Sequence, residues 1–341
     1  MRSYITLVLI IVLNIFSLSN INYITTNFNK QLIWIILAII IYILAININK
    51  HYIYKNIFKI YILFNILLLY LLLFGNAING SKAWLSFAGF SLQPSEFMKI
   101  ILIILLNIIP FIYDKYRLKN IILFIIPSIL TFLEPDTGNV IFYLIILVIV
   151  FILHEKPKNI KKLFLSSLII ILFMIFMYLN YKQVFIDLFG IYRVNRIDEL
   201  FNKESYQLNM SLISIGSAGL FGNKYLINVP FFETDFAFCL LTSLHGFIGS
   251  IIYLLINLLL NIIILLTSQK LPNLERNITI TFLLVKIVQE SINILMTIGI
   301  LPITGITLPL ISYGGSSLMI YAFMLGFINN KSYCMDKQGK H

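Results

Sequence analysis

The stretch Phe231-Phe-Glu-Thr-Asp-Phe-Ala237 marks the point where a polar loop gives way to an apolar run over residues 236–268. A membrane-spanning helix needs about 20 consecutive apolar residues, so this run predicts a span, yet it is too long for one straight crossing. Gly246 and Gly249 are expected to divide it into a short interfacial segment and the span proper. A carboxylate in hydrocarbon costs roughly 2.5–3.5 kcal/mol, so Asp235, at the edge of the run, is the leading candidate for a functional side chain.

The composition of the full chain predicts a polytopic membrane protein and excludes a soluble globular domain. Of the 341 residues, 60% are hydrophobic and only 11% are charged, whereas charged residues make up about a quarter of a soluble domain. The net charge of +11 could suggest nucleic acid as a partner. The basic residues, however, lie in short loops between apolar runs. The excess of Lys and Arg in cytoplasmic loops explains them, and no nucleic acid is expected.

Ten apolar runs predict an all-α fold of ten transmembrane helices, with residues 1–341 forming a single transmembrane domain. The expected spans are residues 4–20, 32–48, 57–75, 94–113, 119–134, 138–154, 162–180, 236–268, 277–299 and 312–330.

The basic loops predict how these helices are oriented. Lys and Arg are concentrated in residues 51–55, 114–119, 155–162, 269–276 and 331–341. All of these segments lie on one side of the membrane if both termini are cytoplasmic, as the positive-inside rule requires. The loops then expected on the outer side are residues 76–93, 135–137, 181–235 and 300–311. The large extracytoplasmic loop, residues 181–235, falls between helices seven and eight.

Pro94 indicates the start of the fourth helix, because its missing N–H costs nothing in the first turn. Glu96 in that turn is favoured by the helix dipole and shares a helical face with Lys99. These residues form either a plain helix start with an ion pair or part of a binding site. Trp84, shortly before them, is either an interfacial aromatic or part of the same site.

Charged residues of the outer loops form a second candidate site. Glu134 and Asp136 flank a proline in a tight turn, where they serve the turn alone, bind a cation or pair with arginine. Arg193 and Arg196 run against the positive-inside bias, so their presence needs a reason. They either pair with acids or bind a phosphate or pyrophosphate through bidentate contacts.

Two further groups have both structural and functional interpretations. Lys286 and Glu290 lie four residues apart within span nine, where they form a structural pair or part of a transport path. Gly216, Gly219 and Gly222 in the long loop are simple turn positions or permit close approach of two backbones.

The stretch from Leu301 to Ser317 contains two prolines and several glycines but no charge. Broken backbone at membrane depth must be buried by other helices, so this stretch is expected to fold back into the protein. Ser312 is expected to cap the tenth helix, whose first N–H groups then form an anion site. Gly314 and Gly315 belong to that site or only let helices pack closely.

Together these motifs resemble the RodA/FtsW/SpoVE family, the SEDS peptidoglycan glycosyltransferases. The motifs are Gly80-Ser-x-x-Trp84, Gln93-Pro-Ser-Glu-Phe-Met-Lys99, Pro135-Asp-x-Gly138, Ser211-Leu-Ile-x-Ile-Gly-Ser-x-Gly-Leu-Phe-Gly222, Thr234-Asp-Phe-x-Phe238, Gly246-Phe-Ile-Gly249 and Leu301-Pro-Ile-Thr-Gly-Ile-x-Leu-Pro-x-Ile-Ser-Tyr-Gly-Gly-Ser-Ser317. Their order, their spacing and the ten-span topology agree from about residue 75 to 330. The last motif is the most specific of them.

The resemblance implies polymerisation of lipid II into glycan strands, carried on polyprenyl diphosphate, at the outer face of the bacterial cytoplasmic membrane. The implied roles are cell shape, division or sporulation, beside a class B penicillin-binding transpeptidase. The implied reaction is an inverting glycosyl transfer with Asp235 as general base or as ligand of a divalent cation, Mg or Mn. The implied substrate contacts are Arg193, Arg196, Lys99, Glu96, Trp84, Gln207, Ser312, Gly314, Gly315 and Ser316.

Two alternatives stand beside this interpretation. A flippase for lipid II, or another transporter, would use Lys286 and Glu290 together with the broken outer segment. A catalytically weak scaffold of the cell-wall machinery is suggested by departures from the family's usual residues. These departures are Ala83 in place of Arg, Glu134 in place of Gln, and Ser243 and Leu244 in place of an acidic pair.

Overall fold

The computed structural model describes residues 2–22, 28–75, 82–87, 90–112, 117–154, 172–190, 205–223 and 227–330, with the single residues 161, 194 and 198. The helices are α1 (Arg2–Asn22), α2 (Phe28–Asn47), α3 (Lys50–Phe74), α4 (Pro94–Ile112), α5 (Arg117–Leu133), α6 (Thr137–His154), α8 (Lys182–Phe189), α10 (Tyr206–Ser217), α11 (Ala237–Ser268), α12 (Asn273–Thr297) and α13 (Gly315–Asn329). A further helical stretch covers residues 172–180. Two short strands, β1 (Leu85–Phe87) and β2 (Phe90–Leu92), form an antiparallel hairpin.

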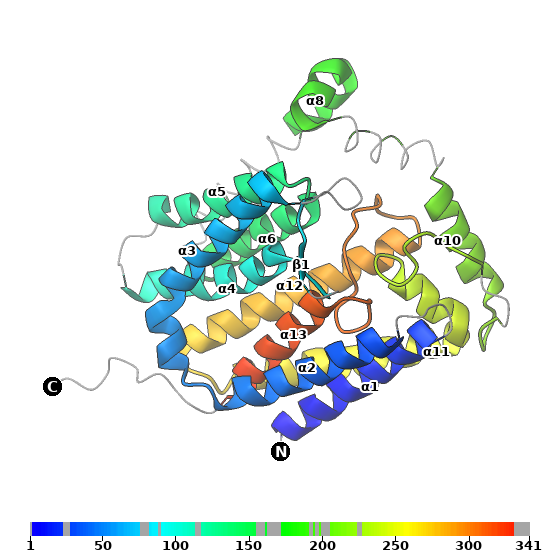
Figure 1. The fold of residues 1–341 in the computed structure, drawn as a ribbon, viewed down its shortest axis with the longest axis horizontal. Helices are drawn as coiled ribbons and strands as arrows, with labels where there is room; N and C mark the ends of the chain where they lie inside the picture. Colours follow the sequence, from blue (N-terminus) through cyan, green and yellow to red (C-terminus); the bar gives the residue numbers. More distant parts are fainter. Residues whose placement is uncertain are drawn as a thin grey trace.

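The long helices lie side by side and give the bundle two distinct ends (Figure 1). At one, the hairpin end, the N–H of Gln93 after β2 donates to Ser316 Oγ at the start of α13 at 2.9 Å. At the other, the Lys50 end, Lys50 Nζ pairs with Glu275 Oε2 at 2.8 Å, which joins the starts of α3 and α12. Asn330, after α13, donates to two carbonyl oxygens of the α2–α3 region there. Successive long helices therefore run in opposite directions.

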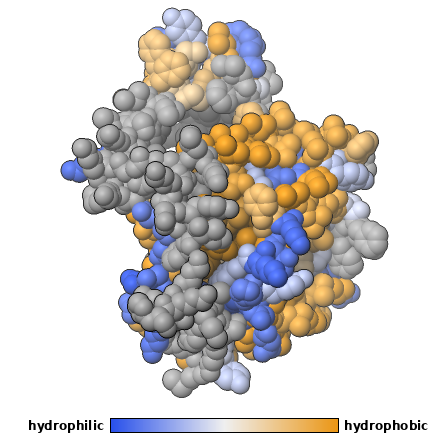
Figure 2. Space-filling view, turned by 90° about the vertical axis from the view of Figure 1, so that its left-hand side faces the viewer, coloured by the Kyte–Doolittle hydropathy of each residue, from blue (hydrophilic) through white to orange (hydrophobic). Residues whose placement is uncertain are grey.

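The described helices confirm a polytopic helical membrane protein. Those long and apolar enough to cross a membrane are α1, α2, α3, α6, α11 and α12. Hydrophobic residues cover much of the described surface in Figure 2, interrupted by groups of hydrophilic residues. The third helix begins at Lys50 instead of residue 57, because Asn49 caps it by accepting from His51 N–H. Most of the expected span 162–180 lies outside the described residues.

The long apolar run after Asp235 is interrupted where the sequence predicts a break, at the first of its two glycines. Gly246 has φ 68° and ψ −167°, whereas Gly249 stays within the helix. A Cβ atom at Gly246 would lie 2.4 Å from Leu220 O, so only glycine fits both the backbone angle and the contact.

Close helix packing explains one of the two glycines before Ser316. A Cβ atom on Gly315 would lie 2.2 Å from the Trp34 ring, so this glycine lets the start of α13 approach α2. Gly314 has φ 150°, and a Cβ atom added there would meet no atom within 4 Å, so it serves the backbone turn and not the packing.

Candidate functional site

Asp235 lies in a turn directly before α11, at the hairpin end of the bundle. The N–H groups of Thr234, Asp235 and Phe236 all point at Phe231 O, at 3.1–3.2 Å. Phe232 and Phe236 are buried beneath the turn, whereas Asp235 itself is half-buried. The turn thus holds a carboxylic acid at the edge of an apolar core.

The uncharged segment between α12 and α13 packs back against this turn, as the sequence predicts. Tyr313 N–H donates to Glu233 O at 2.8 Å, and Ser312 Oγ donates to Thr234 O at 2.6 Å. Leu308 and Leu310 of the segment are buried. The broken backbone is therefore covered by protein, the condition for such backbone at membrane depth.

The predicted capping role of Ser312 is wrong. The last helix begins three residues later, at Gly315, and its N-cap residue Gly314 has no side chain to cap it. Ser312 Oγ instead accepts from Leu308 N–H at 2.7 Å while donating to Thr234 O. The tertiary contact with the Asp235 turn replaces the local cap, and the first N–H groups of α13 are left without a side-chain cap.

A side chain of α12 supplies a third tie to the Asp235 turn. Asn293 Nδ2 donates to Asp235 O at 2.8 Å and to Ile306 O at 2.7 Å. One amide group therefore joins the acid-bearing turn, α12 and the broken segment.

Asp136 is the centre of a compact cluster at the start of α4 and α6. Its Oδ2 accepts from Gln93 Nε2 and Ser95 Oγ, both at 2.7 Å, and from Asn139 Nδ2 at 2.8 Å. These three donors are uncharged, and the arginines considered as partners from the sequence lie outside the described residues. The predicted turn is confirmed, and it fastens β2, α4 and α6 together.

Glu134 in the same turn is fully buried. Burial first, and the nearby charge of Asp136 second, raise the pKa of its carboxyl group from the ordinary value to about 8. At neutral pH this carboxyl group is therefore largely protonated.

Lys99 and Glu96 form the predicted ion pair, with Nζ 2.8 Å from Glu96 Oε2. Lys99 is buried. Its Nζ also contacts Gln289 Oε1 at 3.2 Å and lies 5.0 Å from the centre of the Phe142 ring. Gln289 continues the network, since its Nε2 donates to Thr307 O at 3.0 Å. The pair thus lies inside the bundle and connects α4 to the broken segment.

The second predicted pair, Lys286 with Glu290, lies between α11 and α12. Lys286 Nζ contacts Glu290 Oε1 and donates to Asn257 Oδ1 at 2.7 Å and Asn261 Oδ1 at 2.8 Å. All three protons of the ammonium group therefore have an acceptor within the protein. Since Lys286 is completely buried, this arrangement favours the structural interpretation over the transport path.

The glycine-rich turn after α10 docks on the break in α11. Phe247 N–H donates to Gly219 O at 3.0 Å, and a Cβ atom on Gly222 would lie 2.0 Å from Leu244 O. Gly222 therefore permits close backbone approach, one of the two interpretations left open. Ser243, on α11 before the break, is buried and shares a 2.6 Å hydrogen bond with Ser214.

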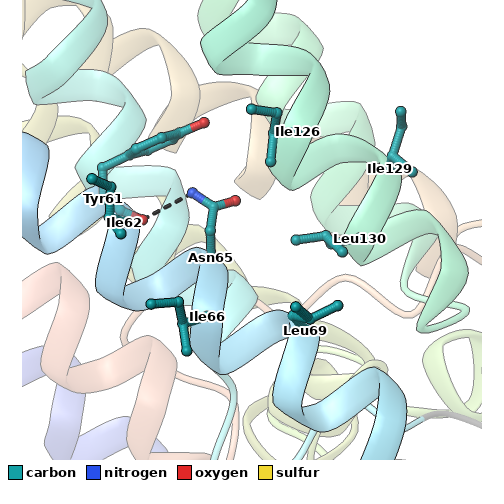
Figure 3. A pocket seen from close by; sticks show the side chains of 8 residues that line it. All are labelled: Tyr61, Ile62, Asn65, Ile66, Leu69, Ile126, Ile129 and Leu130. Carbon is teal, nitrogen blue, oxygen red and sulfur yellow. Dashed lines mark hydrogen bonds between the residues drawn. The ribbon is translucent and has the colours of Figure 1, made fainter.

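An apolar groove of about 470 Å³ opens between α3 and α5. Its lining residues are Tyr61, Ile62, Asn65, Ile66, Leu69, Ile126, Ile129 and Leu130 (Figure 3).

The helix α5 contains Pro127, which has no N–H to donate to Leu123 O. Tyr61 OH donates to that oxygen instead, at 3.0 Å.

The remaining predicted site residues are only partly placed. Trp84 directly precedes β1 and Gln207 lies in the first turn of α10, and both are half-buried at the hairpin end. Arg193 and Arg196 lie outside the described residues. Among the described residues, no three acidic, His or Cys side chains come together as a metal site.

The sequence analysis did not identify three residues that build this site. Gln93 and Asn139 hold Asp136, and Asn293 holds the Asp235 turn. For Asn139 and Asn293 the available signal was an amide within a membrane-spanning segment, since such groups face protein and find partners there.

The fold and this site define a multi-pass helical membrane protein with a polar centre at one end of its bundle. A family model described as cell cycle protein, covering FtsW, RodA and SpoVE, matches residues 2–336. The chain belongs to this FtsW/RodA/SpoVE family.

Individual relatives agree with this assignment. The chain is 32% identical over 277 residues to the probable peptidoglycan glycosyltransferase FtsW of Wigglesworthia glossinidia brevipalpis, covering 73% of this chain and 68% of that protein. It is 31% identical over 285 residues to the stage V sporulation protein E of Bacillus subtilis, covering 76% and 73%.

Solved structures share the fold. A chain from a peptidoglycan synthase complex that coordinates polymerization and crosslinking matches with a TM-score of 0.80 and 21% identity over 95% of both chains. The rod shape determining protein RodA of Thermus thermophilus matches with a TM-score of 0.68 and 22% identity, over 95% of this chain and 94% of that one.

Proposed function

We propose that this protein polymerises lipid II into glycan strands at the outer face of the bacterial cytoplasmic membrane, with Asp235 as its key acid. Membership of the family makes it a peptidoglycan glycosyltransferase that acts in cell shape, division or sporulation. The observation that carries the role of Asp235 is the set of backbone ties around it, from Ser312, Tyr313 and Asn293. A catalytic carboxylate needs this kind of fixed placement.

In the proposed reaction a sugar hydroxyl attacks the anomeric carbon of a second lipid-linked sugar. A new C–O bond forms, the bond to the diphosphate breaks with inversion, and polyprenyl diphosphate leaves. The Asp235 carboxylate accepts the proton of the attacking hydroxyl. In the other form of the proposal Asp235 would hold Mg²⁺ or Mn²⁺, which would supply positive charge for the departing diphosphate, since Mg²⁺ is commonly bound by one or two carboxylates plus substrate phosphates.

The surroundings of Asp235 suit a lipid-linked diphosphate. The uncapped N-terminus of α13 offers N–H groups for an anion. Arg193, Arg196 and Lys99 are the proposed cationic contacts, and Lys99 must leave its buried pair with Glu96 to reach the phosphates. The groove between α3 and α5 offers an apolar surface for the polyprenyl chain.

The full proposal has ten spans, both termini cytoplasmic and residues 181–235 outside. This orientation puts the hairpin end, with Asp235, at the outer face where lipid-linked sugars are joined. The family and the related synthase complex support a class B penicillin-binding protein as partner.

Purified protein and labelled lipid II test the role of Asp235 directly. Asp235→Asn keeps the size of the side chain but removes the base and the anionic ligand, so polymer formation is expected to fall at least about 100-fold. Asp187→Asn, which changes an exposed acid of the same loop on α8, is the matched control and keeps its activity. Equal polymer formation by the two variants would refute the assignment. Loss of activity in EDTA with recovery in Mg²⁺ favours the metal form, and activity that survives EDTA favours the base.

A further inference from the structure

The side chain of Asn293 is the most constrained polar group near Asp235. It is completely buried in α12, and both hydrogens of its amide group are used, on Asp235 O and Ile306 O. Rotating the amide by 180° would set its oxygen against those two carbonyl oxygens. The amide therefore has one orientation, fixed by its neighbours.

The position of this amide links two segments that are far apart in the sequence. Asp235 O belongs to the turn before α11, and Ile306 O belongs to the broken segment before α13. Helix backbone elsewhere satisfies its own carbonyl groups, but neither of these oxygens lies in a regular helix. A buried carbonyl oxygen without a donor is costly, so the amide stabilises both segments in one relative position.

From this geometry we infer that Asn293 is a positioning residue for Asp235, clamping the main chain of the acid to the broken segment. It acts through the backbone of Asp235 and does not touch the reacting atoms. Its loss lets the Asp235 turn move relative to the segment that carries Ser312, Tyr313 and the start of α13. Because misplacement by about 1 Å can cost 100-fold in rate, the clamp supports the catalytic step more than substrate binding.

The chain offers a closely matched control at the opposite end of the bundle. Asn330 is also buried, and its Nδ2 also donates to two main-chain carbonyl oxygens, Ala45 O at 3.0 Å and Ile48 O at 2.6 Å. Asn330→Ala likewise removes two hydrogen bonds from a buried amide to main-chain carbonyl oxygens, here at the Lys50 end. A general loss of stability would therefore affect both alanine variants alike.

Hydrogen–deuterium exchange of peptides covering residues 231–240 tests the clamp without any activity. Asn293→Ala is expected to raise exchange of the Thr234, Asp235 and Phe236 N–H groups about tenfold or more, whereas Asn330→Ala leaves it unchanged. Unchanged exchange in Asn293→Ala overturns the proposal.

Polymerisation kinetics then test the positioning role, which rests on the proposed function of Asp235. Asn293→Ala is expected to lower kcat about 10- to 100-fold with KM changed less than about threefold, and Asn330→Ala to keep kcat within about twofold. Asn293→Asp preserves the shape but replaces the donor by an acceptor, so it is expected to lose at least as much. Near-normal kcat in Asn293→Ala or Asn293→Asp, or equal loss in Asn330→Ala, overturns the inference. A wild-type protein without any polymer contradicts the proposed function instead, and the exchange experiment still decides the clamp.

Discussion

Glu134 illustrates how one buried side chain sets a pH dependence. Its pKa is raised from 4.5 to about 8, by burial first and by Asp136 second. The folded protein therefore binds a proton there that the unfolded chain has released, and stability falls as pH rises from about 4.5 to about 8. Glu134→Gln is expected to remove this loss of stability at high pH, because glutamine does not titrate.

The pH profile of thermal unfolding in detergent checks this prediction. The melting temperature of Glu134→Gln is expected to match the wild type near pH 5 and to exceed it by a few degrees at pH 8, following the sign of the pKa shift. Asp187→Asn, at an exposed position, serves as the control without this trend. A difference in melting temperature between Glu134→Gln and the wild type that shrinks with rising pH would contradict the raised pKa.

At the scale of single elements, α5 depends on a neighbour to tolerate its proline. Tyr61 of α3 donates to Leu123 O, the carbonyl that Pro127 cannot serve. Tyr61→Phe leaves that oxygen without its donor, which is expected to cost about 1–3 kcal/mol and to lower the melting temperature by several degrees. Tyr52→Phe at an exposed site of the same helix is the control. Equal melting temperatures for the two variants would mean that α5 does not need this bond.

The elements also explain which parts of the structure the sequence could predict. Spans and the break at Gly246 follow from local apolarity and glycine, so they were predictable to within a few residues in most helices. The prediction that Ser312 caps the last helix was wrong because its hydroxyl group donates to Thr234 O, 78 residues away. The clamp by Asn293 was equally hidden, since its acceptor is a backbone oxygen 58 residues distant. Backbone acceptors leave no residue type to recognise in a sequence.

On the scale of the whole molecule, buried polar contacts hold the helices in a single arrangement. Lys50 with Glu275 joins α3 to α12 at one end, and the Lys99–Gln289 contact joins α4 to α12 nearer the other. In a membrane, apolar contacts between helices gain little over contacts with lipid, so such polar links and close packing carry the specificity. The polar centre around Asp235 is thus part of the same system that holds the bundle together.

This arrangement makes the proposed orientation testable with two cysteines at opposite ends of the bundle. Tyr206 begins α10 at the hairpin end and is 63% exposed, and Tyr52 near the start of α3 is 67% exposed at the Lys50 end. The background is Cys334→Ser, and Cys239 can stay because it is completely buried. In right-side-out membrane vesicles, a membrane-impermeant maleimide is expected to label Tyr206→Cys, whereas Tyr52→Cys requires permeabilisation. The reverse pattern would place Asp235 on the cytoplasmic side, away from the growing glycan, and both the orientation and the proposed role of Asp235 would fail together.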